Sequence, residues 1–222
     1  MNELTHFFFG YFILHLVLKK RYNGFEAFLG AMGAIIPDID MILGLFMDFE
    51  HGVFSHTLIG GLLFTLIYAL ITWVNGKRFF QKINLSFWNI LFIASIGMLS
   101  HLFLDAFTFF YSVESDATHH MYFWPFWNFP VHINTMFPGA TFKIRVLVEI
   151  LVSVFLIIIL IGYGWIYKKR NPFGVFNPIN WLTYKEEKAP LEIQFEDYKT
   201  DILLLILVNY FIITMLLINY LI

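Results

Sequence analysis

Six titratable side chains lie inside or next to apolar stretches of this sequence of 222 residues. They are three histidines and three aspartates, namely His6, Asp38, Asp40, His56, His101 and Asp105. Burying such groups in an apolar environment costs several kcal/mol, so they persist mainly where they pair, bind a ligand or react. No lysine is expected among them, and neighbouring carboxylates would carry a negative charge that only cations or protons relieve. The set therefore predicts a cation-binding site.

The spacing of these residues lets them act in pairs. His101 and Asp105 are four residues apart in Ser-His-Leu-Phe-Leu-Asp, so on a helix they share one face at roughly 6 Å. Asp38 and Asp40 follow a proline and are two residues apart, a spacing at which side chains of an extended or turn segment point the same way. Each pair can ligate one cation or bridge two.

Each pair also has a simpler structural explanation. His101 and Asp105 could form an ion pair that stabilises one helix. Asp38 and Asp40 could cap the end of a helix. His56 could hydrogen-bond a neighbouring serine or a backbone carbonyl. The convergence of all six residues is what favours the metal site over these alternatives.

Other titratable residues receive less definite interpretations. His51 precedes the next apolar stretch, and Gly52 leaves the approach to it sterically open. His15 is expected to be structural. Three histidines of the outer loop are expected to be solvated, namely His119, His120 and His132. Glu149 is expected to pair with Arg145, four residues earlier. The roles of these four residues stay open.

The composition places these residues in a membrane protein. Apolar residues make up 59% of the chain and charged residues only 14%, which leaves too few polar side chains for a soluble surface. The composition also excludes a disordered chain, and the net charge of −2 argues against nucleic acid as a partner. Cysteine is absent, so a metal would be held by histidine and carboxylate side chains.

The apolar stretches predict an all-α, polytopic integral membrane protein with about six membrane segments. The second segment is expected to be discontinuous, because Pro37 interrupts it and two aspartates follow. The expected segments are Leu4 to Leu18, Phe25 to Met47, Thr57 to Val74, Phe87 to Tyr111, Ile144 to Tyr167 and Ile202 to Ile222.

The distribution of basic residues predicts the orientation. Of the 14 basic residues, 12 follow the first, third or fifth segment, so these connections are assigned to the cytoplasm. The N-terminus then faces outward, and His101 and Asp105 lie about 21 and 27 Å along their helix from its cytoplasmic end. All six acids and histidines collect toward the extracytoplasmic side. Residues 1–140 are expected to form a membrane-embedded hydrolase domain, and residues 141–222 two further helices joined by a cytoplasmic loop at about 168–201.

Mixed histidine and carboxylate ligands suit zinc, manganese or iron, and six such groups suffice for one or two ions. A divalent metal activates water and can clamp the oxygens of a phosphoester. The sequence has neither a Gly-x-Ser-x-Gly elbow nor a phosphate-binding loop, so serine acyl transfer and nucleotide binding have no support.

Five short motifs occur in an order that resembles the YdjM-like family of membrane-bound metal-dependent hydrolases of bacteria and archaea. They are Thr5-His6, Ile36-Pro37-Asp38-Ile39-Asp40, His51 through Thr57, Ser100 through Asp105, and Trp124-Pro125-Phe126. The resemblance covers roughly residues 1–130 and implies a metal and hydrolysis. One position departs from the family, which often has arginine where this chain has Gly52.

A fainter similarity links the order of these residues to zinc-dependent phospholipase C and P1-type nucleases. It implies zinc ligation by His6, Asp40 or Asp38, His56, His101 and Asp105. The later His-x-x-x-Glu of those enzymes is absent, because Met136 stands four residues after His132.

These observations predict a membrane-bound metal-dependent hydrolase acting on an ester, with a phosphoester of a lipid or lipid-linked molecule as the leading substrate. Asp38 or Asp40 would act as general base, and His51 as proton donor or further ligand. Trp124, Pro125 and Phe126 would form an apolar lip that admits a lipid. The alternatives are a cation-binding transporter and a metal-stabilised scaffold without turnover.

Overall fold

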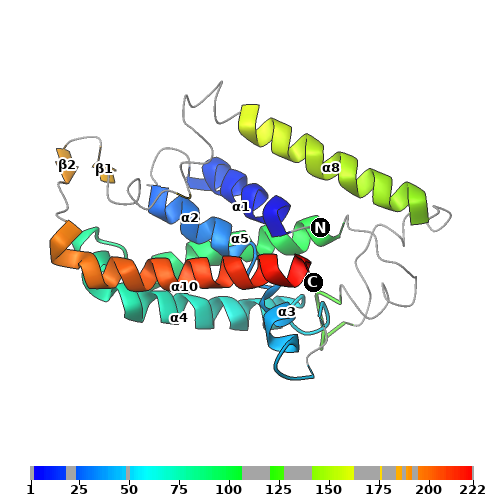
Figure 1. Cartoon of the computed structure of the whole chain (residues 1–222), viewed down its shortest axis with the longest axis horizontal. Coiled ribbons are helices and arrows are strands. Elements are labelled where there is room, and N and C mark those ends of the chain that lie inside the picture. Colours follow the sequence, from blue (N-terminus) through cyan, green and yellow to red (C-terminus); the bar gives the residue numbers. More distant parts are fainter. Residues whose placement is uncertain are drawn as a thin grey trace.

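The structure, a computed structural model, describes residues 3–18, 24–48, 51–106, 121–127, 142–162, 176, 184–186, 189–191 and 195–221. This part of the chain is helical, as expected, apart from one small antiparallel pair of strands (Figure 1). The helices are α1 (Glu3–Leu18), α2 (Gly24–Gly33), α3 (Ile39–Gly44), α4 (Leu58–Lys82), α5 (Phe87–Asp105), α8 (Phe142–Gly162) and α10 (Phe195–Leu221). The strands are β1 (Tyr184–Glu186) and β2 (Ala189–Leu191).

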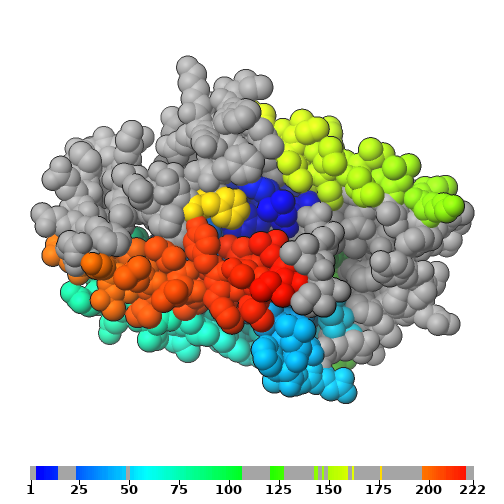
Figure 2. Space-filling model, viewed as in Figure 1, coloured from blue at the N-terminus to red at the C-terminus, as the bar shows by residue number. Residues whose placement is uncertain are grey.

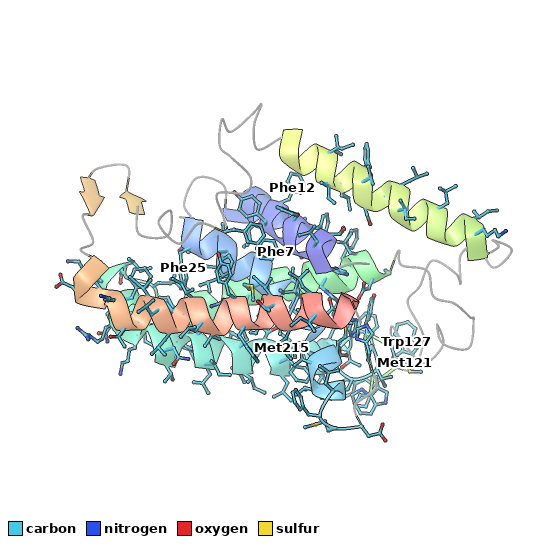
Figure 3. The ribbon with its side chains drawn as sticks, viewed as in Figure 1. Phe7, Phe12, Phe25, Met121, Trp127 and Met215 are labelled. Carbon is cyan, nitrogen blue, oxygen red and sulfur yellow. The ribbon has the colours of Figure 1, made fainter. Side chains whose placement is uncertain are left out.

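The helices pack into one bundle. α1, α2 and α5 contact one another, α4 contacts both α5 and α10, and α8 lies against α1 (Figure 1). The buried core between them is rich in phenylalanine and includes Phe7 and Phe25, which are labelled in Figure 3. Aromatic side chains bury a large apolar area each, which suits contacts between helices that meet over a short length.

Three helical stretches in the described part of the chain are long and apolar enough to cross a membrane, namely Leu58–Lys82, Phe87–Asp105 and Asp197–Ile218. Two shorter apolar helical stretches are Leu4–Leu14 and Ile150–Ile159. α4 and α10 lie next to each other on the face shown in Figure 2. On α4, Leu62, Leu66 and Leu70 form an exposed apolar stripe at helical spacing, as a lipid-facing surface requires.

Glycine lets α2 and α5 approach closely. A Cβ atom added at Gly33 would lie 2.2 Å from the carbonyl oxygen of Ala94, and one added at Gly97 would lie 2.0 Å from the carbonyl oxygen of Gly30. Small residues at such crossings are typical of membrane helix packing. The crossing places the last turns of α5 against the end of α2.

The second apolar segment changes direction earlier than Pro37. α2 ends at Gly33. The next backbone hydrogen bonds span three residues instead of the four of an α-helix, with Ile35 N donating to Met32 O and Ile36 N to Gly33 O. Pro37 has no N–H with which to continue the helix. The short helix α3 follows, with Asp38 at its N-cap position but without a side-chain capping bond. The capping alternative for Asp38 is therefore not what the structure shows.

α10 begins at Phe195, inside the stretch for which the sequence predicted a loop to about residue 201. Asp201 is buried, and its carboxylate accepts hydrogen bonds from the backbone N–H groups of Arg78 (2.9 Å) and Phe79 (3.1 Å). These donors follow a kink in α4 at Gly76. The contact with α4 explains why polar residues before the apolar run are already helical.

Candidate metal centre

The structure brings all six predicted residues together where the start of α4, the end of α5 and the start of α1 meet. His6 lies on α1, His56 lies one residue before the N-cap of α4, and Asp38 and Asp40 come from the N-cap and first turn of α3. His101 and Asp105 lie on the last turns of α5. Each of the six is at most 5% exposed. This is the end of the bundle at which α3 is drawn in Figure 1.

Four side-chain atoms converge at the centre of this cluster: His56 Nε2, His101 Nε2, Asp38 Oδ1 and Asp105 Oδ2. We call them the central quartet. The two imidazole nitrogens are 3.0 Å apart. The Asp105 oxygen lies 3.3 Å from His56 Nε2 and 2.8 Å from His101 Nε2. The Asp38 oxygen lies 3.5 and 3.7 Å from the same two nitrogens.

These separations match a metal site. Ligand atoms placed tetrahedrally about 2.0–2.1 Å from a zinc ion are roughly 3.3–3.4 Å from one another. The five distances that involve a histidine nitrogen run from 2.8 to 3.7 Å and so bracket that value. An ion pair between His101 and Asp105, the simpler explanation, accounts for only one of them.

The hydrogen bonding of His101 leaves a lone pair available for a metal. Its Nδ1 lies 2.7 Å from the carbonyl oxygen of Ala34, which can only accept, so Nδ1–H is the donor. The lone pair of the neutral ring is then on Nε2, inside the quartet. Asp38 Oδ2 is also buried and receives no hydrogen bond from the described residues. Both features fit a bound cation.

His6 lies beside the quartet. Its ring stacks on that of His101 at 3.8 Å, and its Nε2 is 3.1 Å from Asp105 Oδ1. Asp105 therefore faces the quartet with one oxygen and His6 with the other. Neither ring nitrogen of His6 makes a hydrogen bond of good geometry within the described residues, so the single lone pair of the neutral ring is available to a ligand. This arrangement offers a position for a second ion.

Asp40 is surrounded differently. Its Oδ1 lies 2.7 Å from His51 Nδ1, while Oδ2 accepts from the backbone N–H of Gly52 at 2.9 Å and from the Ser55 hydroxyl. Ser55 Oγ is in turn 3.0 Å from His56 Nδ1. Gly52 adopts a φ of 83°, which favours glycine and explains why a side chain is absent at this position.

His51 lies at the edge of the site. Its side chain is 40% exposed, whereas that of Asp40 is fully buried. Burial alone lowers the pKa of His51, but the hydrogen bond with Asp40 and the charge of that carboxylate outweigh burial and raise the pKa above its ordinary value. His51 therefore holds a proton more readily than a free histidine.

The segment 121–127 is attached to the start of α4, close to the site. Leu58 N donates to the carbonyl oxygen of Tyr122 at 2.8 Å, which ties this segment to the start of α4. Trp124 packs against Phe54 at 6.4 Å between ring centroids, and Phe126 is 87% exposed. Figure 3 labels Met121 and Trp127 of the same segment beyond α3.

Tyr122 is a residue that the sequence did not single out. It is buried against Met98 and Leu102 of α5, and burial together with the charge of Asp105 raises the pKa of its hydroxyl. Its only signal in the sequence was its place next to the Trp124-Pro125-Phe126 motif. The side chains of His15 and Glu149, and the histidines His119, His120 and His132, lie outside the described residues.

Comparison with known proteins identifies the family. A family model described as YdjM inner membrane protein matches residues 1–185, a range that extends past the roughly 130 residues that contain the five motifs. No curated protein and no solved structure matches the chain. The family match spans well over half of the sequence and contains every residue of the cluster, so this chain belongs to the YdjM inner membrane protein family.

Proposed function

We propose that this protein is a membrane-bound metal-dependent hydrolase that cleaves a phosphoester of a lipid or lipid-linked molecule. The observation that carries the proposal is the approach of two buried carboxylate oxygens to the same two buried histidine nitrogens, at distances close to those between tetrahedral metal ligands. Buried ionisable groups inside a membrane protein mark functional sites more often than structural ones.

The central quartet would hold the first ion, and His6 with the second oxygen of Asp105 would contribute to another. Two histidines and two carboxylates in this geometry favour zinc, and manganese and iron accept the same ligands. When bound, such an ion makes water acidic enough to react near neutral pH and neutralises negative charge on a phosphoester.

The residues around the quartet supply proton transfer. Asp38 Oδ2 is buried without a hydrogen bond from the described residues, so it can accept a proton from the attacking water. His51 is partly exposed and readily protonated, so it can give a proton to the leaving oxygen. Of the two predicted bases, Asp38 is favoured because Asp40 already accepts three hydrogen bonds, whereas Asp38 Oδ2 accepts none from the described residues.

The proposal includes the membrane topology. We assign six segments to α1, to α2 together with α3, and to α4, α5, α8 and α10, with the metal site toward the extracytoplasmic side and the connection between α8 and α10 in the cytoplasm. α4 supports this arrangement: its first turn lies beside His56, and its last turns carry Lys77 and Lys82. Its 25 residues correspond to about 37 Å, enough to separate the two ends by a bilayer.

Exposed aromatic side chains near the site support a lipid substrate. Trp124 and Phe126 are exposed in a segment that is tied to the start of α4, so they suit contact with acyl chains next to the quartet. Aromatic residues are also common where a membrane protein meets the lipid headgroup region.

The test is turnover by purified protein in lipid nanodiscs, loaded with Zn²⁺ or Mn²⁺. The substrates are a glycerophospholipid, a lipid phosphate monoester and the soluble ester p-nitrophenyl phosphate. We expect metal-dependent hydrolysis that falls by about 100-fold or more in Asp38→Asn. Asp201→Asn is the matched control, because it removes another buried carboxylate at a distance from the quartet. Absence of turnover of every ester contradicts the proposal, and metal flux into vesicles without hydrolysis would favour a transporter.

A further inference from the structure

We infer that Asp40 and Ser55 form a positioning arm that fixes the imidazole of His56 for metal binding, and that Asp40 is not itself a ligand. The inference rests on the proposed metal centre. It assigns different roles to two aspartates that are separated by a single residue, and it follows from the hydrogen bonds around Ser55.

The Ser55 hydroxyl determines which nitrogen of His56 carries the proton. A serine hydroxyl has one hydrogen, and an ionised carboxylate only accepts. Because Ser55 donates that hydrogen to Asp40 Oδ2, its oxygen can only accept from His56 Nδ1, which lies 3.0 Å away. His56 therefore carries its proton on Nδ1, and the lone pair of the neutral ring is on Nε2.

The same conclusion holds for the other histidine of the quartet, through a different partner. His101 Nδ1 donates to the carbonyl oxygen of Ala34, so its lone pair is also on Nε2. The two Nε2 atoms are only 3.0 Å apart, and neither neutral ring has a hydrogen to place between them. Two facing lone pairs repel, so this approach requires a positive charge between them, either a metal ion or a proton added to one ring.

The contacts of Asp40 direct its carboxylate away from the quartet. Its closest approach to His56 is to Nδ1, at 3.7 Å, the nitrogen that points out of the metal site. Its Oδ1 is occupied by His51 and its Oδ2 by Gly52 N–H and Ser55. Asp40 already accepts three hydrogen bonds, whereas Asp38 Oδ1 faces the Nε2 atoms of both His56 and His101.

Asp40 also connects His56, inside the metal site, with His51 at the edge of the site. The carboxylate that anchors His56 through Ser55 also accepts from His51, whose ring lies 5.1 Å from that of His56 between centroids. One buried group thus sets the orientation of a ligand histidine and of a partly exposed histidine. Carboxylates that orient metal-bound histidines in this way typically change metal affinity 10–100-fold when they are removed.

The experiment measures Zn²⁺ affinity of the full chain in detergent by competition with a chromophoric chelator, and the visible spectrum of the Co²⁺-loaded protein. We expect Ser55→Ala and Asp40→Asn to bind Zn²⁺ about 10–100-fold more weakly with an unchanged number of ions per chain. Their Co²⁺ spectra should shift but keep the intensity of a four-coordinate site. Asp38→Ala, which removes a ligand, should lose that intensity.

Thr57→Ala is the matched control. Thr57 is buried two residues from Ser55, and its hydroxyl accepts from Gly60 N at the start of α4. Losing it perturbs the same segment without touching the imidazole of His56, so Zn²⁺ affinity should stay at the parent value. Ser55→Thr, which keeps a hydroxyl, should restore affinity relative to Ser55→Ala.

Two results would overturn the inference while leaving the metal centre intact. One is parent affinity in both Asp40→Asn and Ser55→Ala. The other is loss of the four-coordinate Co²⁺ spectrum in Asp40→Asn, as in Asp38→Ala, which would make Asp40 a ligand. If the parent protein binds no divalent metal, the metal centre itself fails and the inference fails with it.

Discussion

Replacing Gly97 by alanine should weaken metal binding, although residue 97 is not one of the proposed ligands. Gly97 lies one turn before His101 on α5, at the crossing with α2. His101 is oriented by the carbonyl oxygen of Ala34, which becomes available because α2 ends at Gly33. The position of this ligand therefore depends on how closely the two helices approach.

The size of the effect follows from the geometry of the crossing. A Cβ atom at residue 97 would lie 2.0 Å from the Gly30 oxygen and 2.7 Å from the Ala34 nitrogen, and both are backbone atoms that cannot rotate away. Because contacts below 3.0 Å are essentially never seen, the helices must separate by about 1 Å or more. The His101–Ala34 hydrogen bond, now 2.7 Å, would lengthen to about 3.7 Å and break. Overpacking of this kind costs about 1–3 kcal/mol, and loss of the orienting bond about 10–100-fold in metal affinity.

The assay combines thermal unfolding in detergent with Zn²⁺ competition. We expect Gly97→Ala to lower both the unfolding midpoint and the affinity. Gly162→Ala on α8 is the control, since a Cβ atom there meets nothing within 4 Å, and it should change neither. Parent affinity in a folded Gly97→Ala variant would refute the idea that the α2–α5 crossing positions His101.

Four further predictions test other parts of the account. Asp201→Ala removes the acceptor of two backbone N–H groups and should lower the free energy of unfolding by about 1.5–3 kcal/mol without changing Zn²⁺ affinity, as measured by denaturant titration and chelator competition. Tyr68→Phe removes the buried 2.7 Å hydrogen bond between α4 and Asn209 of α10 and should cost about 0.6–1.7 kcal/mol in the same titration. Zn²⁺ at about 100 times its Kd should stabilise the parent by about 2.7 kcal/mol, and a chelator should remove this gain in thermal unfolding. Because the chain has no cysteine, Asp48→Cys and Lys77→Cys give unique labelling sites; in intact cells an impermeant maleimide should react with the first and not the second, and the reverse would invert the proposed orientation.

The long helices were predictable because their apolar runs are continuous. The predicted spans that begin at Thr57, Phe87 and Ile202 correspond to α4, α5 and α10. The all-helical class is confirmed for the described residues, apart from the small pair of strands. Boundaries set by tertiary contacts were not predictable. α10 starts early because Asp201 bonds to α4, and α2 ends at Gly33, where the backbone of α5 is in close contact.

The composition of the site was predictable from the depth of its residues. Lysine and arginine positions alone placed six acids and histidines toward one side of the membrane, and these six do lie together. Their individual roles were not predictable, because Asp38 and Asp40 have the same chemistry at almost the same position. The hydrogen bonds of Ser55 and Gly52, contributed from more than ten residues away, are what distinguish them.

The most direct test of the central claim is the metal content of the purified protein, measured by elemental analysis after reconstitution with Zn²⁺ and removal of free ions. We expect at least one ion per chain in the parent and none in the double variant His101→Ala with Asp105→Ala, which removes two members of the quartet. A parent protein without metal, or an unchanged metal content in the double variant, would contradict the central claim.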